Sequence, residues 1–360
     1  MNILFDIGHP AHVHLLRNTY FNLIKDGYNV YVTTKDISSV IRLLELYNIP
    51  YFSFGKKHDG MLMKGLDQLR YDFRMWWFVM SKHVNVGVHG ITVAHVSKFS
   101  PMKSILPDDD DDEVEPFFTK FAHPFADTVL TPSNIKRETS NAIYYNAFHE
   151  LAYLHPNYFT PDINVLQDVG VEKGEPYFVL RFNAFKAHHD IGAEGLSIEN
   201  KRRLVERLKS RGKVFITTER NIDDEFKPFQ LTVSPEKIHS LLYFSTMFIG
   251  DSQTMTSEAA VLGTPAIKCN SFAGLLSVPN ELEKKYGLCY SFLPNQIEAF
   301  FSKIEDLISL TDIKKEWNRR RQKMLSDKID VTAFFTWFIE NYPESRKIMK
   351  ENPDYQYRFK

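Results

Sequence analysis

The sequence has few cysteines and no excess of charge of one sign. Of its 360 residues only Cys269 and Cys289 are cysteines, and their spacing is not that of metal ligands. This excludes a disulfide scaffold and a cysteine-rich metal site, and favours the reduced core cysteines of a cytoplasmic protein. The formal net charge is −1, so no global electric field favours nucleic acid. We therefore expect no nucleic-acid partner.

Long apolar runs and a basic leader are also missing. No stretch reaches the ~18 consecutive apolar residues that a membrane-spanning helix needs. The chain begins with Met1-Asn-Ile-Leu-Phe5 and enters an apolar strand directly, so we expect no signal peptide and a cytoplasmic location. Apolar residues make up 43% of the chain, enough for ordinary cores, and the length predicts about two domains.

Short apolar runs alternate with helical patterns along the first half of the chain. Residues 2–7 form such a run, and a helical pattern follows to Asp26, closed by Gly27. Even alternation of this kind predicts parallel strand–helix–strand units and a doubly wound sheet. Ligands of such sheets collect at the carboxyl ends of the strands. The pattern loosens between Leu154 and Pro176, and we predict a linker between two domains over 161–176.

The most informative stretch lies over 248–268. An apolar run ends at Gly250-Asp-Ser252, a helix follows to Leu262, and a second apolar run begins at Pro265. The amides and the macrodipole of a helix start favour a phosphate, and Ser252 and Thr254 add hydroxyl groups there. Glu258, nearly two turns further on, is placed to accept hydrogen bonds from a ribose. The simpler alternative is that Ser252 only caps the helix and Glu258 is solvated.

This stretch resembles the nucleotide-binding segment of GT-B glycosyltransferases and of the non-hydrolysing UDP-sugar 2-epimerases. The resemblance rests on Gly250-Asp-Ser252, on Glu258-Ala259 and on Leu262-Gly-Thr-Pro265. It implies that Ser252 meets the diphosphate and that Glu258 holds the ribose. These families usually have a glycine pair where this chain has Gln253-Thr254. The expected nucleotide-sugar contacts are Arg181, Asn183, Ser252, Gln253, Thr254, Met255 and Glu258.

A second resemblance centres on the loop after the first strand, Asp6-Ile-Gly-His-Pro-Ala-His-Val-His14. This loop resembles the start of the DUF354 family, which is grouped with GT-B glycosyltransferases. Three further segments fit the same family, namely Tyr145–Tyr153, Pro176–Arg181 and Thr254–Pro265. His12 also falls where the lipid-linked N-acetylglucosaminyltransferase MurG has the histidine of its first loop.

The three histidines of this loop are candidates for acid–base chemistry. A neutral histidine accepts a proton from an attacking hydroxyl near pH 7, and a charged one donates to a leaving phosphate. We predict that His12 is catalytic and that Gly8, His9 and His14 lie on the acceptor side. No cysteine or regular carboxylate partner completes a metal site with His9 and His12. The alternative is structural, with His14 packed under the helix and His12 capping it.

Six adjacent carboxylates follow the predicted strand over 102–106, from Asp108 to Glu113. Such a run is most often a solvated loop. At a strand end it also has the means to supply a general base or to hold a divalent cation. Among these residues we name Asp109 as a second catalytic candidate.

Apolar residues recur at helical spacing in the predicted helix over 61–82. They are Leu62, Leu66, Leu69, Phe73, Trp76 or Trp77, and Met80. The spacing favours a face buried in the core. Lysines and arginines from Lys56 to Arg74 leave a second option, in which this helix rests on a membrane.

Together these observations predict an α/β protein of GT-B type, with two Rossmann-like parallel-sheet domains facing each other across a cleft. We expect an acceptor domain over 1–160, a nucleotide-sugar domain over 177–325, and a helix over 326–360 that crosses back to the first. The expected function is metal-independent sugar transfer, without a cofactor, from a nucleotide sugar, UDP favoured. The acceptor would be a glycan or a lipid-linked molecule of surface polysaccharide synthesis, with possible contact at the inner membrane face. The alternatives are a UDP-sugar 2-epimerase and a non-catalytic nucleotide-sugar-binding protein.

Overall fold

The structure is a computed structural model, which describes residues 1–55, 61–137, 139–182, 194–218 and 222–360. The chain folds into two units. The first unit contains Met1–Tyr158 and Lys328–Lys360, and the second contains Phe159–Asp327. The second unit is therefore an insertion within the first, and each is described by itself.

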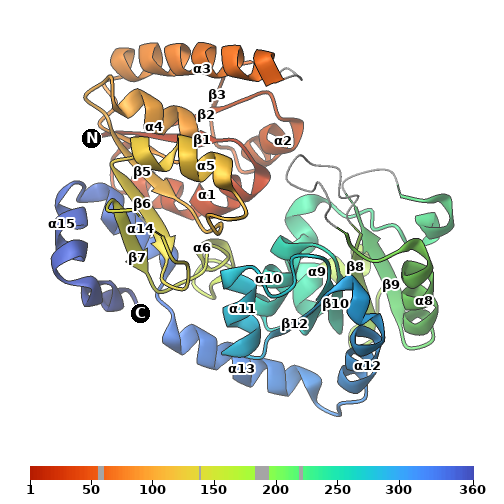
Figure 1. Ribbon diagram of the computed structural model, residues 1–360. Helices are drawn as coiled ribbons and strands as arrows, with labels where there is room; N and C mark the ends of the chain where they lie inside the picture. The colour runs from red at the N-terminus through yellow and green to blue at the C-terminus, as the bar shows by residue number, and fades with distance from the viewer. Residues whose placement is uncertain (56–60, 138, 183–193, 219–221) are drawn as a thin grey trace. The chain divides into compact units, whose positions relative to one another are not determined.

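A seven-stranded sheet forms the centre of the first unit, and every neighbouring pair of its strands is parallel (Figure 1). Across the sheet the strands are β3 (Phe52–Ser53), β2 (Asn29–Thr34), β1 (Asn2–Ile7), β4 (Val86–Val88), β5 (Lys103–Pro107), β6 (Thr128–Pro132) and β7 (Ala142–Tyr145). The order reverses between β1 and β4. Buried apolar residues such as Ile3, Phe5 and Val88 fill the sheet, as is expected of parallel strands covered on both faces.

The helices of the first unit pack in two groups. In one group, α1 (Pro10–Lys25) contacts α2 (Ser38–Leu46), α6 (Leu151–Leu154) and α14 (Val331–Glu340). In the other, α3 (Met61–Ser81) contacts α4 (Ile91–Ser97), and α5 (Pro116–Phe121) with the short helix η1 (His123–Phe125) follows (Figure 1). The last helices are α15 (Glu344–Glu351) and η6 (Pro353–Phe359).

The C-terminal segment completes the core of the first unit. Phe334, Phe335 and Phe338 of α14 are buried, and the ring centroids of Tyr145 and Phe335 lie 5.3 Å apart. Asn157 donates a hydrogen bond of 2.9 Å to Asp330, so the point where the chain leaves this unit adjoins the point where it returns.

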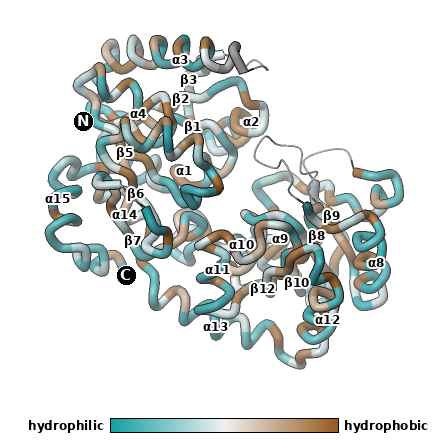
Figure 2. Tube along the Cα trace, viewed as in Figure 1, coloured by the Kyte–Doolittle hydropathy of each residue, from teal (hydrophilic) through white to brown (hydrophobic). Residues whose placement is uncertain are grey.

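The burial predicted for one face of α3 is wrong. Its core side is formed by Tyr71, Met75, Phe78 and Val79, which are buried. The stripe proposed from spacing is instead exposed: Leu69, Phe73 and Trp77 are 67%, 68% and 66% accessible. Figure 2 shows hydrophobic residues recurring along α3. The helix is apolar on two faces, and spacing alone cannot tell which of them meets the sheet.

A five-stranded parallel sheet forms the centre of the second unit. Its order is β12 (Cys289–Phe292), β11 (Ala266–Cys269), β10 (Met247–Gly250), β8 (Tyr177–Arg181) and β9 (Lys213–Thr217). Its α-helices are α7 (Val165–Asp168), α8 (Ile198–Lys209), α9 (Ile238–Phe244), α10 (Gln253–Leu262), α11 (Ser277–Lys284), α12 (Ile297–Ile308) and α13 (Ile313–Asp327). The order reverses between β8 and β10. Both cysteines are free and buried here.

None of the helices in the described part of the chain combines the length and the apolar character that crossing a membrane requires.

Candidate functional site

Polar side chains gather in each unit where the strand order reverses. Parallel sheets bind ligands beyond the carboxyl ends of the strands at such points, because the loops there diverge to opposite faces. In the first unit, His9 and His89 lie in the turns after β1 and β4, and His12 lies in the first turn of α1. In the second, the ends of β8 and β10 carry Arg181 and Ser252.

The imidazole rings of His12 and His89 lie against each other, with centroids 3.8 Å apart. His9 begins α1: its Nδ1 accepts a hydrogen bond of 3.2 Å from the Ala11 amide. The residue that caps this helix is therefore His9 and not His12. His14 lies further along α1 against the ring of Tyr153, with centroids 5.3 Å apart.

The turn after β4 is tightly built. His89 has φ of 68° and Gly90 has φ of 89°. A Cβ on Gly90 would lie 2.5 Å from Oδ2 of Asp6, so only glycine fits between the turn and β1. Burial raises the pKa of Asp6 to about 6, although a hydrogen bond from Thr33 opposes this rise. The turn thus holds the His89 ring against His12.

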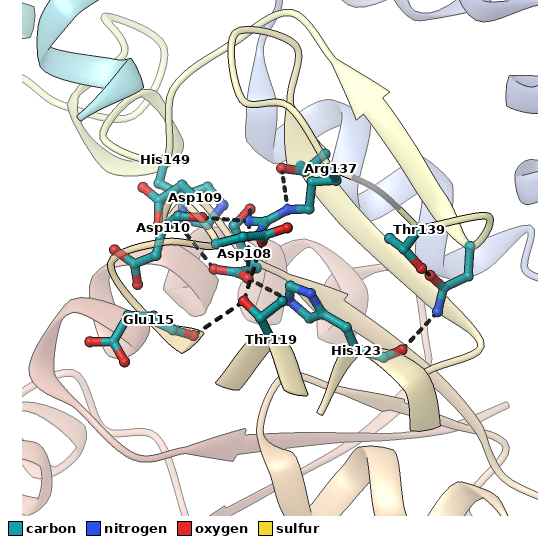
Figure 3. Close-up of polar contacts among 12 residues, drawn as sticks. Asp108, Asp109, Asp110, Glu115, Thr119, His123, Arg137, Thr139 and His149 are labelled. Carbon is teal, nitrogen blue, oxygen red and sulfur yellow. Dashed lines mark hydrogen bonds and ion pairs between the residues drawn. The ribbon is translucent and has the colours of Figure 1, made fainter. Parts of the chain in front are cut away.

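The run of aspartates after β5 is organised around Arg137, whose side chain is fully buried. Its guanidinium bonds Asp108 at 3.0 Å, also pairs with Asp112, and donates to the backbone carbonyl of Asp110 at 2.8 Å (Figure 3). His123 bonds the same oxygen of Asp108, Oδ2, at 2.7 Å. Burial alone would raise the pKa of Asp108, but the hydrogen bond from His123 and the charge of Arg137 lower it. These two carboxylates hold the loop in place.

Asp109 is directed elsewhere. Its Oδ1 lies 2.9 Å from Nδ1 of His149, which follows β7 (Figure 3). The His149 ring is parallel to the ring of Tyr145, with an interplanar angle of 6°. One oxygen from each of Asp108, Asp109 and Asp110 lies within 4.8 Å of the others. Because Asp108 and Asp109 already face Arg137, His123 and His149, we assign no metal to them.

In the second unit, β10 approaches β8 so closely that Gly250 has no room for a side chain. A Cβ there would lie 2.3 Å from the carbonyl oxygen of Arg181. The Asp251 amide donates to that same oxygen at 3.2 Å. The Arg181 side chain is buried, and its Nη1 donates to Thr217 at 3.3 Å. The turn into α10 therefore lies directly beside the end of β8.

Ser252 is the N-cap of α10, and its hydroxyl accepts from the Met255 amide at 3.4 Å. Among the residues that the structure describes, none accepts a hydrogen bond from the amides of Gln253 and Thr254. Thr254 is exposed, whereas Met255 is buried. Amides at a helix start favour an anion, so the first turn of α10 has the chemistry of a phosphate site.

The Gln253 side chain is held against β11. Its carbonyl oxygen accepts a hydrogen bond from Lys268, and its amide nitrogen lies 3.4 Å from Oδ1 of Asn270. Lys268 is completely buried, and burial lowers its pKa to about 8. Asn270 also donates to the carbonyl oxygen of Asp251 at 2.8 Å. Gln253 stands where the related families usually have a glycine, and its side chain is hydrogen-bonded to Lys268 of β11.

Glu258 is buried on α10, and its Oε1 lies 3.0 Å from Nε2 of His239 on α9. This pairing holds the carboxylate in the middle of α10, so Glu258 is not a solvated surface residue.

The predicted site residues lie in both units. In the first unit, His9 and His12 lie beside His89, and Asp109 lies beside His149. In the second unit, the cap residue Ser252 and the α10 residues Gln253, Thr254 and Glu258 follow one another along the chain. Asn183, with neighbouring Lys186, His188 and His189, lies outside the described residues. Sequence reasoning gave no role to His89, Arg137, His149, His239 or Lys268. His89 could have been found from its place at the end of a predicted strand. His149 could have been found because it lies in Tyr145–Tyr153, a segment that resembles the DUF354 family.

A family model described as "Protein of unknown function (DUF354)" matches residues 1–323. The chain belongs to the DUF354 family. This confirms the resemblance seen in the first loop and in the segment from Thr254 to Pro265. A curated relative is the uncharacterized protein MJ0665 of Methanocaldococcus jannaschii. It is 22% identical over 327 residues, which span 85% of this chain and 91% of the relative.

Comparison with solved structures shows which fold the chain adopts. One is a candidate UDP-N-acetylglucosamine 2-epimerase from Listeria monocytogenes, with a TM-score of 0.66 and 13% identity, covering 95% of this chain and 96% of the other. Another is a glycosyltransferase from Rickettsia africae, with a TM-score of 0.61 and 11% identity, covering 97% and 98%. The protein therefore has the α/β fold of GT-B proteins, as predicted.

Proposed function

We propose that this DUF354 protein is a glycosyltransferase that moves a sugar from a nucleotide-diphosphate sugar to an acceptor hydroxyl. The observation that carries the proposal is the start of α10. It combines two amides without a protein acceptor among the described residues, the Ser252 cap, and a buried carboxylate, Glu258, further along the helix. A diphosphate at the amides and a ribose at Glu258 match this spacing.

A uridine nucleotide is the favoured donor. The support is likeness alone: a neighbour in fold is named for UDP-N-acetylglucosamine. In this assignment the second unit binds the nucleotide sugar through Ser252, Gln253, Thr254 and Glu258, and the first unit binds the acceptor near Gly8, His9, His12 and His14. The transfer needs no metal, because buried cationic groups and helix amides stabilise a leaving diphosphate.

The acceptor we propose is a glycan or a lipid-linked molecule of surface polysaccharide synthesis. Support comes from the exposed apolar face of α3. Leu66, Leu69, Phe73 and Trp77 are each more than 60% accessible, and Phe99, whose carbonyl accepts from the indole of Trp76 at 3.0 Å, is 78% accessible. Aromatic side chains with neighbouring basic residues suit the surface of an anionic bilayer. The protein would then work at the inner membrane face.

The alternative of a 2-epimerase is supported by likeness in fold. It requires a group that moves a proton at the sugar carbon. Asp108, Asp109 and Asp112 are bonded to Arg137, His123 and His149. Burial and the neighbouring Asp109 raise the pKa of Asp110 to about 8, so Asp110 is the carboxylate of this loop that an epimerase would use.

Incubation with a panel of UDP-, GDP- and CMP-sugars tests the proposal. Transfer predicts that nucleotide release depends on an added lipid-linked or glycan acceptor, and that Ser252→Ala lowers this release. Ser210→Ala, at the end of α8, is the control. Epimer formation without nucleotide release would favour the alternative enzyme. Binding of a nucleotide sugar without transfer or epimerisation would indicate a non-catalytic nucleotide-sugar-binding protein.

A further inference from the structure

Three imidazoles, His89 buried and His12 and His149 partly buried, share one neighbourhood at the carboxyl edge of the first sheet. His12 follows β1, His89 follows β4, and His149 follows β7. The rings of His12 and His89 are in contact, and both interact electrostatically with His149. Each ring has two nitrogens, and the hydrogen bond made by one nitrogen determines what the other can do. The three rings differ in this respect.

His12 is arranged as a hydrogen-bond donor. Its Nδ1 accepts from the Gly8 amide at 3.3 Å, so the proton of the neutral ring is on Nε2. Burial, followed by His89 and His9, lowers the pKa of His12 well below its usual value. Near pH 7 the ring is neutral and presents an N–H at Nε2. In this tautomer it has no lone pair there with which to take a proton from a substrate.

His89 is neutral as well. Burial lowers its pKa to about 4, although Asp108 opposes this change, and its Nδ1 is buried without a hydrogen-bond partner among the described residues. Its ring is held by the turn at Gly90, as described above. The rings of His12 and His89 are therefore both uncharged near pH 7.

His149 differs from both because a carboxylate faces it. Its Nδ1 is 2.9 Å from Oδ1 of Asp109, so in the neutral ring the proton is on Nδ1 and Nε2 carries the lone pair. Nε2 is buried and has no hydrogen-bond partner in the described protein. Tyr145 stacks on the ring and the edge of Phe335 meets it, with centroids 6.3 Å and 6.2 Å away. The ring is therefore fixed with an unused acceptor atom.

Charged groups around His149 support this role. Burial disfavours its charged form, but Asp109, Glu150 and Asp108 outweigh burial and raise the pKa of His149. The titratable groups that face it are Asp108, Asp109 and Asp110 from the loop after β5, His12 from α1, His89 from β4, Tyr145 from β7 and Glu150 from its own segment.

We propose that His149, paired with Asp109, is the catalytic base of the sugar transfer, and that His12 is a donor that orients the acceptor or the sugar. This inference rests on the proposed function. The lone pair of His149 Nε2 takes the proton of the acceptor hydroxyl as its oxygen bonds to the anomeric carbon. The bond from that carbon to the diphosphate oxygen breaks, and the nucleoside diphosphate leaves with the electron pair. The proton remains on His149, with Asp109 balancing its charge, until solvent removes it.

The pairing is testable in the free protein. Histidine ¹⁵N NMR on the wild type is expected to show His12 protonated at Nε2, and His149 protonated at Nδ1 with a pKa above that of a free histidine. Asp109→Asn keeps an oxygen that accepts from Nδ1 but removes the charge, so the pKa of His149 falls. A His149 that does not titrate, or one unaffected by Asp109→Asn, would overturn the inference without any activity measurement.

The catalytic role is tested by the pH dependence of kcat/KM. A base works in its neutral form, so activity rises as pH rises through the pKa of His149. Asp109→Asn shifts this rise to lower pH and reduces the plateau. His149→Gln loses the rise and roughly 10²–10⁴-fold in kcat, with nucleotide affinity kept. His83→Gln, an exposed histidine of the same unit, leaves the profile unchanged.

Two failures are distinguishable. If the wild type transfers sugar but His149→Gln keeps the rise and most of kcat, His149 is not the base and the proposed function stands. If the wild type transfers no sugar from any donor of the panel, the function and the base assignment fall together. Should His149→Gln not fold, Asp109→Asn and the wild-type NMR titration still decide the question.

Discussion

His239 and Glu258 form a buried pair, with Nε2 of the histidine 3.0 Å from Oε1 of the glutamate. The two side chains come from neighbouring helices, α9 and α10, which pack against each other. The pair fixes the carboxylate at one rotamer, because one of its oxygens is bonded to His239. A ribose would therefore meet a carboxylate that is already oriented.

Glu258→Gln is expected to weaken nucleotide binding by about 1–3 kcal/mol, the range for a hydrogen bond to a charged group. Calorimetric titration with UDP measures this loss. Glu206→Gln, an exposed glutamate on α8, should bind UDP as the wild type does. Equal affinity of the Glu258 and Glu206 variants would remove the ribose role.

His12→Ala is expected to lose most turnover while nucleotide affinity, which we propose depends on the second unit, stays near that of the wild type. The reason is loss of the Nε2 donor that we place at the acceptor. Since the pKa of His12 is far below 6.5, the variant should keep the pH profile of its remaining activity. A purely structural His12 would instead lower the melting temperature and preserve turnover per folded molecule.

Lys268→Met is expected to stabilise the protein and to weaken nucleotide binding. Burial lowers the pKa of Lys268 from 10.5 to about 8, so its charged form is disfavoured by folding. This destabilising contribution to the free energy of unfolding is fully present below about pH 8 and disappears above pH 10.5. The variant should therefore gain about 1–3 kcal/mol at pH 7, and this gain should shrink as pH rises from 8 to 10.5.

Nucleotide binding by Lys268→Met should change in the opposite direction. A diphosphate at α10 interacts favourably with the charged lysine, so wild-type affinity should fall as pH rises from 7 to 9. In the variant, affinity should be lower at pH 7 and should lack this decline. Titrations of both proteins with UDP at several pH values measure it, and identical pH profiles would exclude any contribution of Lys268.

Gly250→Ala should destabilise the second unit by about 2–3 kcal/mol, because the added Cβ would overlap the Arg181 carbonyl. Gly8→Ala is the matched control, since no atom lies within 4 Å of the position its Cβ would occupy. Urea unfolding of the two variants compares them. A loss as small for Gly250→Ala as for Gly8→Ala would mean that β10 shifts freely from β8.

Phe73→Ser with Trp77→Ser should abolish flotation with anionic vesicles at low salt while leaving the fold intact, because both side chains are exposed. Leu275→Ser, which removes an exposed apolar residue of the second unit, is the control and should float as the wild type does. If the wild type itself remains in the soluble fraction, the proposed membrane contact of α3 is wrong.

The sequence predicted well those features that depend on local pattern. Alternating strands and helices indicated two parallel sheets, and Ser252 was placed at the start of a helix that it caps. The exposed stripe of α3 was the second of two options, and a core face was favoured over it, because Met75 and Phe78 form another apolar face of the same helix and the packing of the sheet decides between the two faces. The alternative to a catalytic His12, in which His12 caps α1, is wrong because His9 is the cap; both are polar residues near the start of the helix, and the pattern does not tell them apart.

Partnerships between distant residues lay beyond what the sequence could provide. The aspartate run looked like a solvated loop, yet Arg137 comes from beyond the following strand and binds two of its carboxylates. Lys268 stands within an apolar strand pattern, and nothing local indicates that its ammonium group meets Gln253. Such pairs depend on strand order, which brings the ends of neighbouring strands together.

The insertion of the second unit has a consequence for how the chain matures during synthesis. Phe334 and Phe335 pack on Tyr145, and Asp330 bonds Asn157, so the first unit lacks part of its core until its last residues have left the ribosome. Every residue of the second unit is made before these. The second unit, which we propose binds the nucleotide sugar, is therefore synthesised in full before the residues of α14 that complete the core of the first unit.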